Sequence, residues 1–248
     1  MLTTPMPSQS LAPDRAVVLI TGFGPFPTVA ANATSILVPR IVEAGRRALP
    51  GVSFVGRILP TEWVGSVAEL DDLTRRLRPT VALHFGVSGR ATGFEIETRG
   101  RNHCSHSEDA AGCLPRHACL SPGGPEYLPA TLPAAHIVER LRRRGLPAQV
   151  SRDAGGYLCN ALLYRSLEIA RETGWPQRSG FVHLPANLVN ARRPALDPRR
   201  ALGLGWEDVV EGSVEIAAAA LGRPFPVAGW SRRAPMINGR STMRGSAA

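Results

Sequence analysis

Residues 148–172 read AQVSRDAGGYLCNALLYRSLEIARE, and this stretch carries the local pattern from which the fold follows. Its first four residues are typical of a short strand, and Gly155 and Gly156 predict a tight turn. Beyond the turn, apolar side chains recur at helical spacing, with arginine and glutamate between them. A strand, a turn and a helix in direct succession indicate one unit of an α/β fold.

The same alternation of strands and helices extends along most of the chain. Apolar runs predict strands at 16–21, 52–59, 81–86, 148–151 and 180–183. Periodic stretches predict helices at 33–48, 62–77, 134–145, 158–172 and 205–221. This order predicts a single-domain three-layer α/β/α sandwich with a largely parallel central sheet. A chain of 248 residues, 44% of them hydrophobic, is long enough to bury a sizeable core.

Cys159 and His183 are the candidate reactive residues. Cys159 falls in the first turn of the helix predicted at 158–172, where free N–H groups and the helix dipole favour a thiolate over a thiol. His183 follows an apolar strand, so we expect its imidazole at the carboxyl end of that strand, where ligands bind in open α/β sheets. The alternatives are a buried structural cysteine and a histidine that only caps the sheet.

An acidic partner for His183 is expected in the alternating stretch FEIET at 94–98. Glu95 and Glu97 share one face of that predicted strand, and their spacing does not distinguish between them. A thiol, an imidazole and a carboxylate are the groups that nucleophilic acyl transfer requires. The sequence therefore points to this chemistry, with Cys159 as the nucleophile.

Further motifs accompany these residues in a fixed order along the chain. They are TGFGPF at 21–26 with NAT at 32–34, LPT at 59–61, HFGVSG at 84–89, GP at 124–125, TLP at 131–133, DAGGYLC at 153–159 and GFVHLP at 180–185. Together they resemble the pyroglutamyl peptidase I family, also called pyrrolidone carboxyl peptidases, over about residues 17–185. The resemblance implies a cysteine peptidase that hydrolyses the amide bond after an N-terminal pyroglutamyl residue of peptides. It also implies a catalytic triad of Cys159, His183 and Glu97, without a cofactor.

The resemblance implies roles for the residues around the triad as well. Phe23 and Phe26 match the family's aromatic pair and are expected to hold the lactam ring of the substrate, with core packing as the alternative. Tyr157 is expected to wall the pocket or simply to pack. Backbone amides of the loop at Gly89 and Arg90, together with that of Cys159, are expected to stabilise the oxyanion.

The chain departs from the bacterial pattern of the family in three places. ETRGRN at 97–102 and Val87 in the Gly-rich loop are closer to animal members. ANLVN at 186–190 does not follow the usual bacterial sequence after Pro185, and this last departure leaves other functions open. The alternatives are a catalytically inactive scaffold with the peptidase fold and a broader small-amide cysteine hydrolase. Family members are often dimers or tetramers, so a homodimer or homotetramer is expected.

The net charge of +9 comes from 29 basic residues, all of them arginine and spread over the chain, so no nucleic-acid partner is expected. Residues 1–14 are predicted to be a flexible extension, 15–222 the peptidase domain and 223–248 a flexible tail. No signal peptide or membrane span is predicted, and a cytoplasmic location is expected.

A metal site is the remaining alternative that the residue types raise. The spacing of the potential zinc ligands matches no paired zinc motif. These residues are His103, Cys104, His106, Cys113, His117 and Cys119. We therefore expect no metal.

Overall fold

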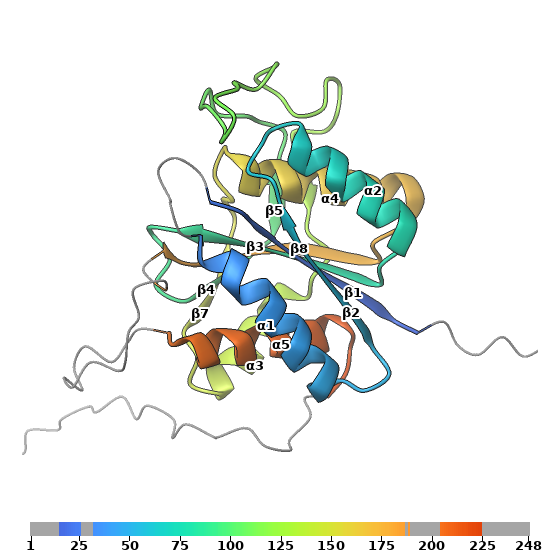
Figure 1. The fold of residues 1–248 in the computed structure, drawn as a ribbon, viewed down its shortest axis with the longest axis vertical. Helices are drawn as coiled ribbons and strands as arrows, with labels where there is room; N and C mark the ends of the chain where they lie inside the picture. Colours follow the sequence, from blue (N-terminus) through green and yellow to red (C-terminus); the bar gives the residue numbers. More distant parts are fainter. Residues whose placement is uncertain (1–14, 26–31, 187, 189–203, 225–248) are drawn as a thin grey trace, which may run out of the picture.

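The computed structural model describes residues 15–25, 32–186, 188 and 204–224 (Figure 1). The strands of these residues are β1 (Val17–Phe23), β2 (Ser53–Leu59), β3 (Val81–Ser88), β4 (Phe94–Glu97), β5 (Arg99–Arg101), β6 (Tyr127–Pro129), β7 (Ala148–Ser151) and β8 (Arg178–Pro185). The helices are α1 (Ala33–Ala48), α2 (Gly65–Leu77), α3 (Ala134–Arg143), α4 (Leu158–Thr173) and α5 (Trp206–Ala220).

The central sheet has six strands in the order β2-β1-β3-β8-β4-β7. The strands β2, β1, β3 and β8 are parallel, whereas β4 runs antiparallel to β8 and β7 runs parallel to β4. Helices α2 and α4 cover one face of the sheet, and α1, α3 and α5 cover the other (Figure 1). The predicted three-layer sandwich with a largely parallel sheet is therefore confirmed.

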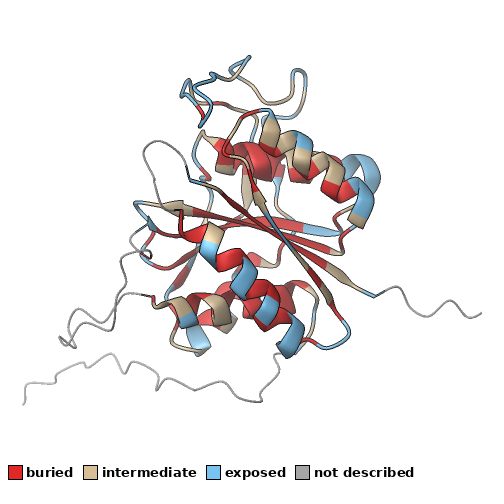
Figure 2. Ribbon diagram, viewed as in Figure 1, coloured by how far each residue is buried: buried red, intermediate tan, exposed pale blue. Residues whose placement is uncertain are grey.

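Burial follows from the alternation of side chains along each strand. In β1, Val18 and Ile20 join the core cluster under α1, α3 and α5, whereas Leu19 joins the cluster under α2 and α4. Figure 2 shows the sheet and the inward helix faces as buried, with exposed residues on the outer faces of the helices. Because both faces of the sheet are covered, its central strands are apolar along nearly their whole length.

The structure differs from the sequence-based expectations at a few element boundaries. Strands β3 and β8 extend to Ser88 and Pro185, beyond the predicted ends. Helix α2 begins at Gly65 and not at residue 62, because residues 61–64 form a turn in which the Trp63 N–H is bonded to the Asp109 carboxylate. The short pair β5 and β6, three residues each, was not predicted, since such short strands leave no periodic signal.

Among the described helices, none combines the length and the apolar character that a membrane span requires. The predicted extension at 1–14 and residues 225–248 of the tail predicted at 223–248 lie outside the described residues.

Candidate active site

Three elements meet where Cys159, His183 and Glu97 lie. Cys159 is the second residue of α4, His183 is near the carboxyl end of β8, and Glu97 is the last residue of β4. Strand β8 pairs with β4, and α4 packs on β8. The fold therefore gathers a thiol, an imidazole and a carboxylate that are up to 86 positions apart in the chain.

Glu97 is the carboxylate that bonds the imidazole. The distance between His183 Nδ1 and Glu97 Oε1 is 2.9 Å, and the bond is buried, since Glu97 is 0% exposed and His183 only 6%. Glu95 lies on the same face of β4 but is partly exposed, and it accepts a hydrogen bond of 2.7 Å from Gln149 Nε2. The structure thus makes the choice that spacing alone left open.

His183 also interacts with Cys159, and this interaction acts on the pKa of the ring. Burial alone lowers the pKa of the imidazole, but the neighbouring Cys159 and Glu97 outweigh it and raise the pKa of His183 to about 10. The raised pKa favours the protonated form of the ring near neutral pH. An imidazolium next to a cysteine favours the thiolate, which is the nucleophilic form.

Gly86 allows strand β3 to pass directly beneath the sulfur. It is the register partner of His183, and a Cβ added at Gly86 would lie 2.9 Å from Cys159 Sγ and 2.7 Å from the ring of Phe181. A Cβ at Gly89 would meet nothing within 4 Å, so close packing does not require that glycine. The Arg90 N–H donates to Ser88 Oγ at 3.2 Å. A glycine is therefore required for close packing at Gly86, within β3, and not at Gly89.

The aromatic candidates differ in how they are placed. Phe23, at the end of β1, is 3% exposed and belongs to a core cluster with Trp63 and Leu158. The partly exposed Tyr157 ring meets Trp63 edge-on, with 5.1 Å between ring centroids, and its hydroxyl donates to the Glu108 carbonyl at 3.0 Å. Phe26 lies outside the described residues.

Asn160 is a site residue that the sequence analysis missed. It follows Cys159 directly and is 1% exposed. Its side chain accepts a hydrogen bond from the Arg101 N–H at 2.8 Å and donates to the carbonyls of Arg101 and His103 at 2.8 and 3.0 Å. Since β5 follows Glu97 closely in the chain, Asn160 ties the segment of the acid to the helix of the nucleophile. The Cys-Asn pair in the sequence was the only signal for this role.

A second missed feature is the loop 105–113, which docks on the residues before Cys159. Its Ser105 N–H donates to the Gly156 carbonyl at 2.6 Å, and its Ser107 carbonyl accepts from Trp63 Nε1 at 3.0 Å. Asp109, 4% exposed, accepts from the Trp63 N–H at 2.9 Å and from two N–H groups of its own loop. These bonds fix the wall formed by Trp63 and Tyr157 next to the nucleophile.

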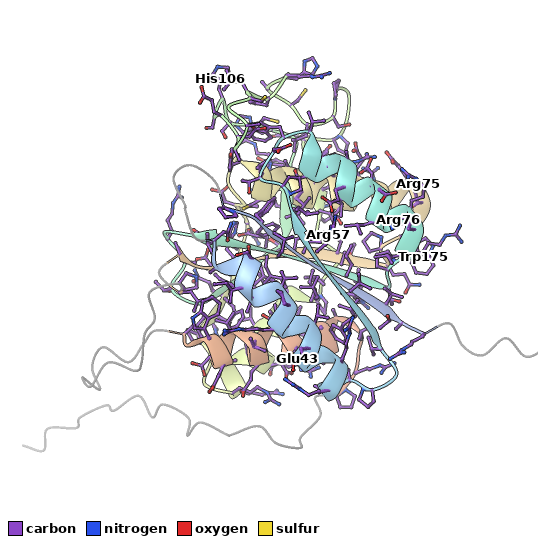
Figure 3. All side chains as sticks on the ribbon, in the orientation of Figure 1. Glu43, Arg57, Arg75, Arg76, His106 and Trp175 are labelled. Carbon is purple, nitrogen blue, oxygen red and sulfur yellow. The ribbon has the colours of Figure 1, made fainter. Side chains whose placement is uncertain are left out.

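Metal ligands do not gather in the segment 103–119. Within the described parts of the chain, the only grouping of His, Cys, Asp and Glu side chains close enough to share an ion is Glu95, Glu97 and His183. There His183 Nδ1 is bonded to Glu97. The four cysteines are free thiols, and burial, together with Cys119, raises the pKa of Cys104 to about 11. His106 lies far out on the loops beyond α4 and α2 (Figure 3).

Comparisons with known proteins agree with this geometry. Residues 16–216 match the family described as pyroglutamyl peptidase. The chain is 35% identical over 169 residues to pyrrolidone-carboxylate peptidase 1 of Ralstonia nicotianae, covering 68% of this chain and 77% of that protein. It is 31% identical over 171 residues to the pyrrolidone-carboxylate peptidase of Pyrococcus furiosus, covering 68% of this chain and 80% of that protein.

Solved structures show the same likeness in three dimensions. A mutant pyrrolidone carboxyl peptidase from the hyperthermophile Pyrococcus furiosus superposes with a TM-score of 0.71 at 28% identity, covering 83% of this chain and 98% of that one. The enzyme from Thermococcus litoralis gives a TM-score of 0.71 at 25% identity, covering 84% of this chain and 94% of that one. Residues 16–216 match the family, and the carboxyl end of β8 brings together a thiol, an imidazole and a carboxylate. The chain therefore belongs to the pyroglutamyl peptidase family.

Proposed function

We propose that the chain hydrolyses the amide bond after an N-terminal pyroglutamyl residue, with Cys159, His183 and Glu97 as its catalytic triad. The observation that supports the proposal is the buried hydrogen bond between His183 and Glu97, together with the interaction of the same imidazole with Cys159. In this family context, such an array is suited to acyl transfer through a thioester. No observation favours an inactive scaffold.

The first half of the reaction acylates the sulfur. The Cys159 thiolate attacks the carbonyl carbon of the pyroglutamyl residue, and the imidazolium of His183 gives its proton to the departing amine. The new C–S bond and the broken C–N bond leave a pyroglutamyl thioester and a shortened peptide. Glu97 holds the ring in the productive orientation and stabilises its charged form.

The second half returns the enzyme to its starting state. His183, now neutral, takes a proton from a water molecule as that water attacks the thioester, and pyroglutamate leaves as the thiolate and imidazolium are restored. In both halves the oxyanion needs N–H donors, each worth about 3 to 4 kcal/mol in the transition state. We assign them to the Cys159 N–H and to the Gly89 and Arg90 loop, where the Arg90 N–H would have to leave Ser88 Oγ.

Specificity in this proposal follows from the chemistry of the lactam ring, which is small and uncharged. Phe23 and Phe26 would line the ring, and Tyr157 would form a wall held by Trp63 and the loop 105–113. An apolar wall leaves an α-ammonium group without its water, and so it disfavours peptides with a free N-terminus. The homodimer or homotetramer and the cytoplasmic location expected from the sequence stay predictions.

Release of a fluorophore from a pyroglutamyl amide tests the proposal. We expect turnover by the wild type, its loss in Cys159→Ala, and inactivation by iodoacetamide. Cys113→Ala is the matched control, because Cys113 is an exposed thiol of the loop 105–113, and it should keep full turnover. Undiminished turnover by Cys159→Ala would contradict the assignment, and equal cleavage of prolyl and alanyl amides would favour the broader amidase.

A further inference from the structure

A second carboxylate faces the triad, and the proposed reaction does not use it. Glu95 is the direct register partner of His183 in the antiparallel pair of β4 and β8. Side chains of directly opposed residues point to the same face of a sheet with their Cβ atoms about 4.5 to 5.5 Å apart. In agreement, an oxygen of Glu95, an oxygen of Glu97 and a ring nitrogen of His183 all lie within 4.8 Å of one another.

Glu95 is held where it is by the next strand. Gln149 of β7 is its register partner on the other side and donates a hydrogen bond of 2.7 Å from Nε2 to Glu95 Oε1. A row of Gln149, Glu95 and His183 therefore crosses three strands of the sheet. The hydrogen bond orients one oxygen of the carboxylate without adding a positive charge, so the negative charge of Glu95 is not neutralised by this partner.

A small number of titratable groups lies near His183. Cys159 faces it from α4, and Glu97 and Glu95 face it from β4. Strand β3 contributes His84, and the ring centroids of His84 and His183 lie 6.5 and 4.8 Å from that of Phe181. Burial lowers the pKa of His84 to about 3, so that ring is neutral in the working range. Cys159 and Glu97 are thus the groups known to act on the pKa of His183, and Glu95 is the further carboxylate within reach of the ring.

We propose that Glu95 is a positioning residue of the active site, which favours the protonated form of His183 by placing a second negative charge next to the ring that Glu97 already binds. Glu97 supplies the direct, buried bond, and Glu95 acts through space from a partly solvated position. Charge at that distance in a partly aqueous environment shifts a titration by about 0.5 to 1 unit and is weakened by salt.

The test follows the titration of His183 itself, by NMR of protein with ¹³C-labelled histidine and without substrate. Relative to the wild type, Glu95→Gln should lower the His183 midpoint by about 0.5 to 1 unit, because the amide keeps the shape and removes the charge. Glu95→Asp should stay near the wild type. Glu43→Gln is the control, since Glu43 is an exposed carboxylate on the outer side of α1 (Figure 3) and should leave the midpoint unchanged.

Salt separates a charge effect from a structural one. The difference between wild type and Glu95→Gln should shrink clearly in 1 M salt. An unchanged midpoint in Glu95→Gln, an equal fall in Glu43→Gln, or a difference that salt does not reduce would each overturn the proposal.

The catalytic readout rests on the proposed function and is kept separate. In turnover of a pyroglutamyl amide, Glu95→Gln should move the alkaline limb of kcat to lower pH by the same amount as the NMR midpoint. If the wild type shows no turnover while the His183 midpoint still shifts, the proposed function fails and the role of Glu95 stands. If turnover is normal and the His183 midpoint does not move, the proposed function stands and the proposed role of Glu95 fails.

Discussion

Gly86 is the single residue on which the approach of β3 to the nucleophile depends. Gly86→Ala places a methyl group 2.9 Å from Cys159 Sγ, and either the sulfur or the strand must shift. Because a displacement of about 1 Å can cost about 100-fold in rate, we expect kcat/KM for a pyroglutamyl amide to fall by about that factor.

Gly205→Ala is the control outside the proposed site, because its added methyl group meets only Asp208 Oδ2, at the ordinary contact distance of 3.4 Å. It should keep kcat/KM within a few-fold of the wild type. Equal losses in the two variants would show that the sulfur contact at Gly86 is not what matters.

Asn160 is expected to matter for stability and rate together. Asn160→Ala removes three buried hydrogen bonds and leaves the Arg101 N–H and two carbonyls without that partner. We expect the free energy of unfolding to fall by about 2 to 4 kcal/mol in urea titrations. We also expect a drop in kcat, since the link between the acid segment and α4 is lost. Glu172→Ala changes an exposed residue at the other end of α4, and it should lower neither the free energy of unfolding nor kcat.

At the scale of elements, the loop 105–113 packs against the residues before α4, and hydrogen bonds to the Asp109 carboxylate hold it in place. Burial raises the pKa of Asp109, but the N–H groups of Trp63, Cys113 and Ala111 outweigh this, so the pKa lies below its ordinary value. A carboxyl group with a lowered folded-state pKa stabilises the fold above its unfolded pKa, and this contribution is lost as the pH falls through the folded pKa.

Asp109→Asn should therefore destabilise the protein by about 1 to 3 kcal/mol at pH 7, since the charged acceptor is lost. The difference from the wild type should shrink below about pH 4, where the wild-type carboxyl group is itself protonated. Urea titrations at both pH values measure it. A difference that stays constant with pH would show that the carboxylate charge is not what holds the loop.

Across the whole molecule, the layer opposite the active site depends on a buried ion cluster. Glu215 of α5 is 2% exposed and pairs with Arg140 and Arg144 of α3. Because the variant leaves two arginines beside an apolar layer, we expect Glu215→Ala to lower the free energy of unfolding by about 3 to 5 kcal/mol.

The control for Glu215 lies on the same helix pair. Glu139→Ala removes an exposed partner of Arg143 in α3 and should change the free energy of unfolding by less than about 0.5 kcal/mol. Denaturant titrations of both variants measure the two free energies of unfolding. A loss in Glu215→Ala no larger than that in Glu139→Ala would mean that the buried cluster adds little.

The position of every long element followed from local pattern. Helix α1 and strand β7 have the predicted bounds, and α4 and α5 differ by one residue at their ends, because apolar periodicity is a property of neighbouring residues. The direction of β4 and β7 was not predicted, since strand direction in a sheet depends on connections that local pattern does not encode.

The sequence by itself determined the layered fold, the helix that presents Cys159, the strand that presents His183 and the family, because each depends on residues close together in the chain or on motifs in a fixed order. Spacing left Glu95 and Glu97 open and the family resemblance implied Glu97, but only the tertiary structure shows the hydrogen bond between Glu97 and the imidazole. Both side chains share a face of β4, and although Glu95 is the direct register partner of His183, the ring is bonded to Glu97. The register between β4 and β8 aligns residues 86 positions apart in the chain, so a local sequence pattern does not predict it.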